Sequence, residues 1–409
     1  MLRIPRPTRF VSRSVSVYQR SLSAEAALAA TFGSSPPVSH PAFDVVSSKN
    51  LMEDLGDVEA TLYCHRATGA EVLSMRSADT NKVFGVTFMT PPDSSDGVAH
   101  ILEHSVLCGG RKYPLKEPFV ELLKGSMHTF LNAFTYADRT CYPVASTNLK
   151  DFYNLIDVYL DAVFFPKITP LTFSQEGWHY AVSDAGDTLR DTASAKPELG
   201  YKGVVFNEMK GVYSQPDSLI HRHMSSALFS DPDHIYNHDS GGDPARIPDL
   251  KYDDFVAFHE RYYRPSRARF FFFGDDPEEE RLHLIESTLA DLAEAHPSRC
   301  NPLPKVDVPY RPLGTPGDRL VVPYPSSEAN VGAGAPAEGD HYVMRGWVIN
   351  DEPLSTEDSI ALGITNDLLV GNTSSSLYRD LMDSKLGTAF IGGGLSDELK
   401  QATFSVGPK

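Results

Sequence analysis

Five consecutive residues near the start of the chain constrain its fold most. They read His100, Ile101, Leu102, Glu103 and His104. In an α-helix, residues four apart lie one turn apart on the same face, so the two imidazoles can converge on a single metal ion. Glu103 lies on that face as well. The order His, two residues, Glu, His therefore predicts a helix here, with a bound zinc ion and hydrolysis by metal-activated water as its chemistry.

The flanking residues predict a strand, a turn and a helix. Residues 82–89 have the composition of a buried strand, and residues 90–96 are rich in turn formers and helix N-caps. Residues 97–107 are apolar at helical spacing and are followed by two glycines. Imidazoles in such a helix need partners, because an unpaired buried polar group costs about 1–3 kcal/mol. The alternative is a chance pair, since the chain has 14 histidines.

A hydrolytic zinc ion normally takes three protein ligands and leaves a fourth position for water. The best candidate for the third is Glu208, which lies in the helix-like stretch 203–211 among apolar residues. The alternative for Glu208 is an ordinary surface glutamate. Cys108 is a rival ligand four residues beyond His104, but it adjoins the glycines that should end the helix, and a buried cysteine is most often a small hydrophobe.

Several further motifs resemble those of the pitrilysin family of metallopeptidases, whose metal motif has this inverted order. The segments that carry the resemblance are 97–104, Gly109-Gly110, Tyr113-Pro114, 129–135, Cys141-Tyr142-Pro143, Gln175-Glu176-Gly177-Trp178, 204–211, Ser240-Gly241-Gly242-Asp243-Pro244 and Tyr263-Arg264-Pro265-Ser266. The match runs from about Phe43 to the end and is most similar to the branch that degrades cleaved presequences in mitochondria and plastids. It implies that Glu208 is the third ligand of one Zn²⁺ per chain.

Glu103 is the expected general base. A zinc ion held by two neutral imidazoles and one carboxylate keeps a net positive charge and lowers the pKa of its bound water to about 7. A carboxylate beside that water can take its proton and pass it to the leaving amine. Glu176 is a candidate hydrogen-bond partner for the histidines.

Residues 129–135 predict a short strand, and residues 136–139 predict a turn. If that strand is a sheet edge beside the metal, an extended peptide can add to it through main-chain hydrogen bonds. Otherwise it is an ordinary hairpin arm. The resemblance implies substrate binding on this edge, with Asn132, Ala133 and Phe134 as substrate-binding residues and the side chain of Asn132 near the scissile bond.

The first 24 residues contain five arginines and no acidic residue, which is typical of an organellar transit peptide. We expect residues 1–35 to be a transit peptide and disordered N-terminus, with the mitochondrial matrix as the destination and the plastid stroma as the alternative. No apolar run is long enough for a membrane span. The net charge of −17 disfavours nucleic acid and favours short unfolded, often basic, peptides as partners. Four cysteines without paired spacing fit a reducing compartment.

The predicted fold class is α+β, with helices packed on a mainly antiparallel sheet in repeated units, the second incomplete. We place a catalytic zinc-binding unit at 36–290, a proline-rich linker at 291–317 and a non-catalytic unit at 318–409. A shift of 262 residues aligns 82–88 with 344–350, and puts Leu362, Thr365 and Asn366 in place of the metal motif. The resemblance implies a protein about twice this length, so a missing C-terminal half or a partner chain would be needed to close a substrate chamber. We therefore expect this chain alone to bind zinc but to be impaired in proteolysis.

The leading functional prediction is a zinc metallo-oligopeptidase that hydrolyses cleaved presequences and other short unfolded peptides in an organelle. One alternative is a subunit similar to the mitochondrial processing peptidase, which the 104-residue gap from His104 to Glu208 disfavours. The other is a non-catalytic scaffold subunit. A scaffold has no reason to keep four polar groups in an apolar site, so the intact motif disfavours that alternative too.

Overall fold

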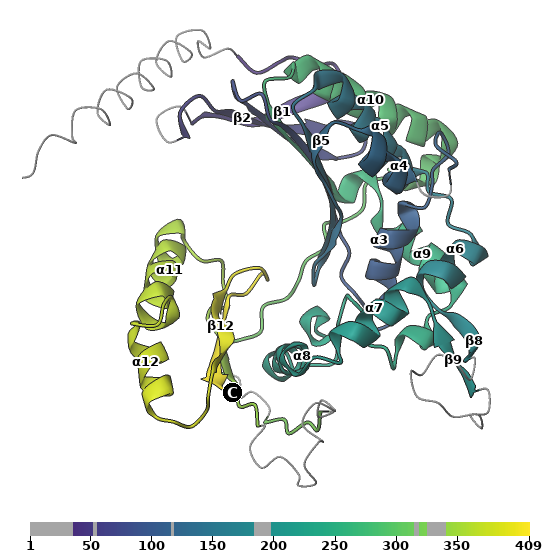
Figure 1. Cartoon of the computed structure of the whole chain (residues 1–409). Helices are drawn as coiled ribbons and strands as arrows, with labels where there is room; N and C mark the ends of the chain where they lie inside the picture. The colour runs from purple at the N-terminus through teal and green to yellow at the C-terminus, as the bar shows by residue number, and fades with distance from the viewer. Residues whose placement is uncertain (1–35, 52–54, 116–117, 184–197, 315–318, 325–340) are drawn as a thin grey trace, which may run out of the picture.

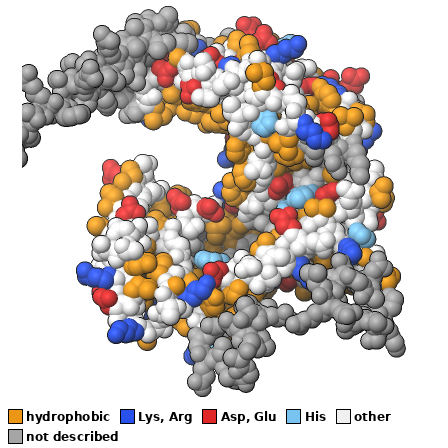
Figure 2. Space-filling view, in the orientation of Figure 1, with side chains coloured by type: hydrophobic (Ala, Val, Ile, Leu, Met, Phe, Trp, Pro, Cys, Tyr) orange, Lys and Arg blue, Asp and Glu red, His pale blue; other side chains and the backbone are white. Residues whose placement is uncertain are grey.

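The computed structural model describes residues 36–51, 55–115, 118–183, 198–314, 319–324 and 341–409. These residues form a large unit with a curved sheet and a small unit with its own sheet, and most of the helices lie on the outer side of the sheet of their unit (Figure 1). The space-filling view shows a hollow between the two units (Figure 2). The expected transit peptide falls within residues 1–35, which lie outside the described residues.

The large unit is built on an eight-stranded sheet in the order β1-β2-β3-β10-β4-β7-β5, with the short strand β6 also paired to β7. Its strands are antiparallel except for the parallel pair β3 and β10. Their bounds are β1 Phe43–Asn50, β2 Glu59–His65, β3 Glu71–Arg76, β4 Lys82–Met89, β5 His128–Leu131, β6 Phe134–Thr135, β7 Arg139–Ser146 and β10 Ala268–Gly274. The α+β class with a mainly antiparallel sheet is therefore confirmed.

Helices cover one face of this sheet and form the core with it. In β4 the alternate residues Phe84, Val86 and Phe88 are fully buried and belong to this core. The long helix α5 begins after Asn148, whose side chain accepts a hydrogen bond from the Asp151 amide and so satisfies one free end of the helix. The helices of the unit are α3 Val98–Val106, α4 Pro118–Gly125, α5 Leu149–Phe164, α6 Pro170–Glu176, α7 Val204–Val212, α8 Pro216–Leu228, α9 Tyr252–Tyr262 and α10 Glu278–Ala295.

Most elements predicted from periodicity are present within one to two residues of their expected bounds. The strand at 82–89 is β4, the metal-motif helix is α3, and the helix around Glu208 is α7. The predicted strand at 129–135 is wrong as a single element, because the chain leaves the ladder at Asn132 and Ala133 and divides it into β5 and β6. Elements without a clear sequence signal include β1, α4, α6 and the hairpin of β8 His179–Ser183 with β9 Glu198–Lys202.

The small unit repeats part of the large one, as the 262-residue shift predicts. Its elements are β11 Arg345–Val348, α11 Thr356–Val370, α12 Ser376–Asp383, β12 Phe390–Ser396 and β13 Thr403–Pro408. The order β11-β13-β12 matches the order β4-β7-β5, and all these pairs are antiparallel. The pair Phe390 and Pro408 falls on the pair His128 and Ser146, and a bulge follows in both. The β11–β13 pairing differs from β4–β7 by one residue.

The domain boundaries given above stay predictions. Helix α10 continues to Ala295 and so passes position 290, where the first boundary was placed. Residues 301–314 contain no helix or strand and connect the two units, in keeping with a linker in that region. Within the described residues, no helix is both long and apolar enough to span a bilayer.

Candidate metal centre

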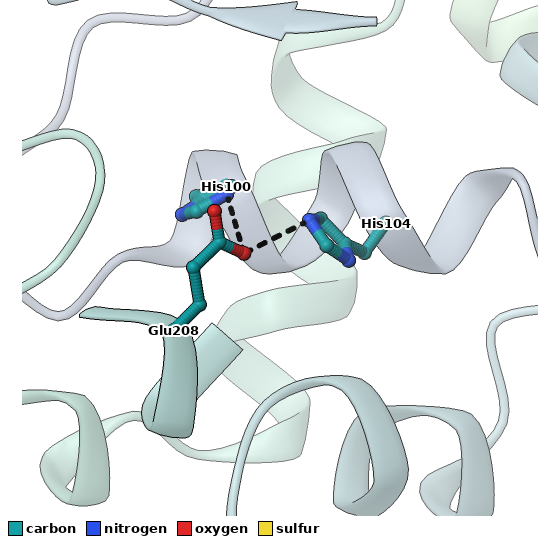
Figure 3. Close-up of side chains that lie close together, drawn as sticks. All are labelled: His100, His104 and Glu208. Atoms are coloured by element: carbon teal, nitrogen blue, oxygen red, sulfur yellow. Dashed lines mark ion pairs between the residues drawn. The ribbon is translucent and has the colours of Figure 1, made fainter. Parts of the chain in front are cut away.

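The structure brings His100, His104 and Glu208 together, and these are the three residues expected to hold a metal ion (Figure 3). Glu208 Oε2 lies 3.8 Å from His100 Nε2 and 3.7 Å from His104 Nε2. One potential ligand atom from each residue lies within 4.8 Å of the others. Ligands at 2.0–2.1 Å around a tetrahedral zinc ion are about 3.4 Å apart, so small side-chain shifts would complete the set.

The two histidines come from one turn of α3, and Glu208 comes from α7, which lies across from it (Figure 3). The side chains of His100 and His104 are 12% and 27% exposed, whereas that of Glu208 is 49% exposed. The centre is therefore buried on the side of α3 and open to solvent on the side of α7. This exposure gives a water molecule and a substrate access to the three donors.

A backbone carbonyl orients the His100 ring. Its Nδ1 lies 3.1 Å from the oxygen of Gly241, so this nitrogen carries the proton and donates the hydrogen bond. The unprotonated Nε2, whose lone pair can bind a metal, faces Glu208. The loop can reach α3 because Gly242 packs against Gly97, where a Cβ on Gly242 would lie 2.8 Å from the Gly97 Cα. Both glycines have positive φ, at 101° and 72°.

Glu176 is the partner of His104 on the other side of the ring. Its Oε2 lies 3.5 Å from His104 Nδ1, and it is only 6% exposed. Burial raises the pKa of Glu176, but hydrogen bonds from His104 and Gln175 outweigh this effect and bring that pKa below its usual value. Burial lowers the pKa of His104, but the hydrogen bond to Glu176 and the negative charges of Glu103 and Glu208 raise it above 6.5.

Cys108 does not join the group of possible metal donors. Its thiol lies 3.5 Å from Glu176 Oε1 and 3.5 Å from the carbonyl oxygen of His104. It therefore donates to the carboxylate that supports His104. The rival assignment of Cys108 as a third ligand has no geometric support, because its sulfur is turned towards Glu176.

Glu103 lies between the two histidines in sequence, and its carboxylate is held from the neighbouring strand. The hydroxyl of Thr135 donates to Glu103 Oε2 over 2.6 Å. Sequence reasoning missed this contact, although Thr135 is the last residue of the segment 129–135 already selected for substrate binding. Alternation along the strand gave no signal for this contact, because Asn132 and Ala133 lie outside both β5 and β6.

The segment expected to bind substrate lies at the free edge of the sheet. Strand β5 is the last strand in the sheet order, and β6 pairs only with β7 among the described strands. Asn132 is exposed and its carbonyl oxygen accepts from the Tyr159 hydroxyl at 3.2 Å, while Ala133 and Phe134 are half-buried. Peptide addition requires a free sheet edge next to the metal motif, and this edge lies next to that motif. The roles of the three residues stay a prediction.

The centre thus has two nitrogen donors and one carboxylate oxygen, with a further carboxylate, Glu103, beside them. Two imidazoles with one carboxylate are a donor set that suits zinc and leaves a fourth position open. Each imidazole has a second partner, Gly241 for His100 and Glu176 for His104, as histidine ligands usually do. The residues present therefore fit a catalytic zinc ion.

Comparisons with known proteins agree with this reading. The family model described as Insulinase (Peptidase family M16) matches residues 88–195, and the model described as Peptidase M16 inactive domain matches residues 249–407. The chain is 49% identical over 369 residues to "Presequence protease 1, chloroplastic/mitochondrial" of Arabidopsis thaliana, covering 90% of this chain and 32% of that protein. It is 38% identical over 344 residues to "Presequence protease, mitochondrial" of Danio rerio, covering 84% and 32%.

Among solved structures, a protease from Helicobacter pylori matches with a TM-score of 0.57 at 16% identity, over 85% of this chain and 74% of that one. This likeness shows the fold alone. The chain spans about a third of the length of the curated relatives that it matches, rather than the half that the resemblance implied.

Proposed function

Because the chain belongs to peptidase family M16, we propose that it is the zinc-binding part of a metallo-oligopeptidase that hydrolyses cleaved presequences and other short unfolded peptides. The observation that carries the proposal is the convergence of His100, His104 and Glu208 beside Glu103. His100, His104 and Glu208 would hold one Zn²⁺. When bound, the ion would supply Lewis acidity and a water of lowered pKa.

The remaining chemistry belongs to the side chains of this chain. Glu103 would take the proton of the attacking water and deliver it to the leaving amine as a general acid. Its carboxylate is held at Oε2 by Thr135, which leaves Oε1 for the water. His100 and His104 must be neutral to bind a metal, and their second partners, Gly241 and Glu176, fix the ring orientations that direct Nε2 towards Glu208.

The free edge formed by β5 and β6 supports the substrate side of the proposal. An extended peptide would pair with this edge through main-chain hydrogen bonds, next to Asn132, Ala133 and Phe134. The edge leads directly to Thr135, so a peptide bound there would pass close to Glu103. The acidic net charge of −17 favours basic peptides by long-range attraction.

The proposed compartment is the mitochondrial matrix, with the plastid stroma as the alternative. The Arabidopsis thaliana relative is named chloroplastic/mitochondrial, and the Danio rerio relative is named mitochondrial. The arginine-rich, acid-free first 24 residues agree with import into either organelle. Since the relatives are about three times as long as the matched region, we assign closure of the chamber to a further segment or to a partner chain.

Metal analysis tests the centre directly. The wild-type protein should bind one zinc ion per chain, and His104→Ala should bind none at the same zinc and protein concentrations. His283→Ala is the control, because His283 is an exposed residue of α10, far from α3 along the chain. Zinc binding by His104→Ala at the wild-type level would refute the ligand assignment.

Hydrolysis tests the activity separately. A quenched fluorescent peptide with the sequence of an arginine-rich presequence should be cleaved by the zinc-loaded wild type, less efficiently than by a full-length relative, and not by Glu103→Gln. A wild type that binds zinc but cleaves no such peptide, alone or with the rest of a longer relative, would favour the scaffold alternative. Cleavage of whole precursors at one position, with cleaved presequences left intact, would favour the processing-peptidase alternative.

A further inference from the structure

We propose that Thr135 is the positioning residue for Glu103, so that the strand next to the bound peptide also sets the orientation of the general base. This inference rests on the proposed function, in which Glu103 moves the proton. Thr135 touches no reacting atom itself. Its hydroxyl acts through the carboxylate that it holds.

The contact has the geometry of a strong hydrogen bond. The Thr135 hydroxyl lies 2.6 Å from Glu103 Oε2, within the range of about 2.5–2.7 Å for a hydroxyl that donates to a carboxylate. It joins two elements that come from different parts of the chain, β6 and α3. Bonds of this type are stronger than those between neutral groups, so this one can select a single carboxylate orientation.

The backbone of Thr135 is itself held in place. Strand β6 pairs with β7 through Phe134 with Cys141 and Thr135 with Thr140. The turn between the strands is closed by the Tyr136 amide, which donates to the Arg139 carbonyl at 2.8 Å. A β-branched side chain on a strand has few χ1 rotamers, so the hydroxyl has little freedom once the backbone is fixed.

The same turn is anchored to both units. Asp138 is buried, accepts the Tyr236 hydroxyl at 2.7 Å, and its carbonyl oxygen accepts the Thr90 amide at 2.8 Å. Tyr236 also accepts the Lys400 amide of the small unit at 2.9 Å. The turn that carries Thr135 is therefore fixed by contacts on several sides, as a support for a catalytic group needs to be.

Without this bond, the half-buried Glu103 side chain would keep three rotatable bonds and lose the hydroxyl that fixes its carboxylate. Most of its rotamers would turn the carboxylate away from the water. Misplacement of a reacting group by about 1 Å can cost about a hundredfold in rate, whereas peptide binding on the edge needs no Glu103 carboxylate. The expected signature is a loss in kcat of about tenfold to a hundredfold, with KM nearly unchanged.

The test compares Thr135→Val, which has nearly the same shape but no hydroxyl, with Thr135→Ser, which keeps the hydroxyl. Thr288→Val is the control, because Thr288 lies on α10 and its hydroxyl only donates to the Leu284 carbonyl. The first readout is the Glu103 side chain in crystal structures of the wild type and all three variants. The second is kcat and KM of the zinc-loaded proteins on the quenched presequence peptide.

In Thr135→Val we expect Glu103 in a different or split conformation, and in Thr135→Ser and Thr288→Val we expect the wild-type one. Activity should fall in Thr135→Val and return largely in Thr135→Ser. A Glu103 carboxylate that keeps its position in Thr135→Val would overturn the inference, as would a rise in KM without a fall in kcat. The crystallographic readout needs no turnover, so this inference is tested even if the chain alone is inactive, whereas inactivity together with the rest of a longer relative would refute the proposed function.

Discussion

Replacing Glu176 by Gln should weaken zinc binding without removing a ligand. The carboxylate is 6% exposed, and its Oε2 faces His104 Nδ1 at 3.5 Å. Glutamine keeps the shape of the side chain and a hydrogen-bond acceptor, but it loses the negative charge that makes the imidazole of His104 a stronger ligand for the metal. Loss of such a partner usually costs 10- to 100-fold in metal affinity, which corresponds to about 1.4–2.7 kcal/mol.

The neighbours of Glu176 decide how much of this range applies. Its Oε1 accepts from the Gln175 amide nitrogen at 2.8 Å and from the Cys108 thiol at 3.5 Å. A glutamine that turns its oxygen to His104 places its NH₂ group against the Gln175 NH₂ group. Rotation of the Gln175 amide by 180° relieves that clash, but it cannot restore the charge. We therefore expect a loss of at least about tenfold.

The effect should depend on pH in a defined direction. The hydrogen bond to Glu176 helps to raise the pKa of metal-free His104 above 6.5, and zinc requires the neutral ring. Below that pKa, the wild type therefore binds zinc in competition with a proton that the Gln variant holds less tightly. The loss of zinc affinity in Glu176→Gln should therefore be largest at pH 8.5 and smaller at pH 6.

Zinc dissociation constants from chelator competition at these two pH values are the assay. Glu121→Gln, an exposed residue of α4 that pairs with Lys124, is the matched control and should bind zinc like the wild type. Equal affinities of Glu176→Gln and the wild type at pH 8.5 would refute the reasoning about the second partner. A deficit of the same size at both pH values would refute the link to protonation of His104.

Three further predictions concern the base, a buried histidine and a buried ion pair. Glu103→Gln should bind zinc like the wild type and lose about 10²–10⁴-fold in kcat on the presequence peptide; a loss of zinc instead would show that Glu103 is a ligand. Burial, aided by the nearby charge of Arg299, lowers the pKa of His259 to about 3. As the pH falls from 6.5 towards 3, the free energy of unfolding should therefore decrease by about 1.4 kcal/mol per pH unit relative to that of His259→Gln. Urea unfolding measures this difference. Arg281→Met breaks a fully buried pair with Asp276 at 2.6 Å and should lower the free energy of unfolding by about 3–5 kcal/mol, and a loss below 1 kcal/mol would contradict this.

Much of the fold follows from local patterns in the sequence. Strand β4 and helix α3 are strongly apolar and flanked by turn formers, so periodicity alone places them within a residue or two. The hairpin of β8 and β9 was missed because its side chains remain exposed; Tyr180 and Leu199 are 61% and 70% exposed. Its larger apolar residues do alternate, at Tyr180 and Val182 and at Leu199 and Tyr201, but each strand has only five residues and these side chains face solvent rather than a core.

The break between β5 and β6 could not be predicted from alternation either. Asn132 and Ala133 lie outside both strands although the residues around them alternate. The Asn132 amide still donates to the Pro143 carbonyl of β7 at 3.3 Å, whereas the Asn132 carbonyl accepts from the Tyr159 hydroxyl of α5. A hydrogen bond from a helix behind the sheet is a tertiary contact. The pattern of side chains along the strand contains no information about it.

The sequence by itself determined that His100 and His104 point the same way with Glu103 beside them, because residues four apart on a helix share a face whatever the rest of the chain does. Only the tertiary structure decided which residues contact these three side chains. Glu208 lies 104 residues beyond His104, and the other partners come from helix α6 (Glu176), a loop (Gly241) and strand β6 (Thr135). Such meetings depend on how the whole sheet and its covering helices pack, and helical periodicity acts only over a few turns.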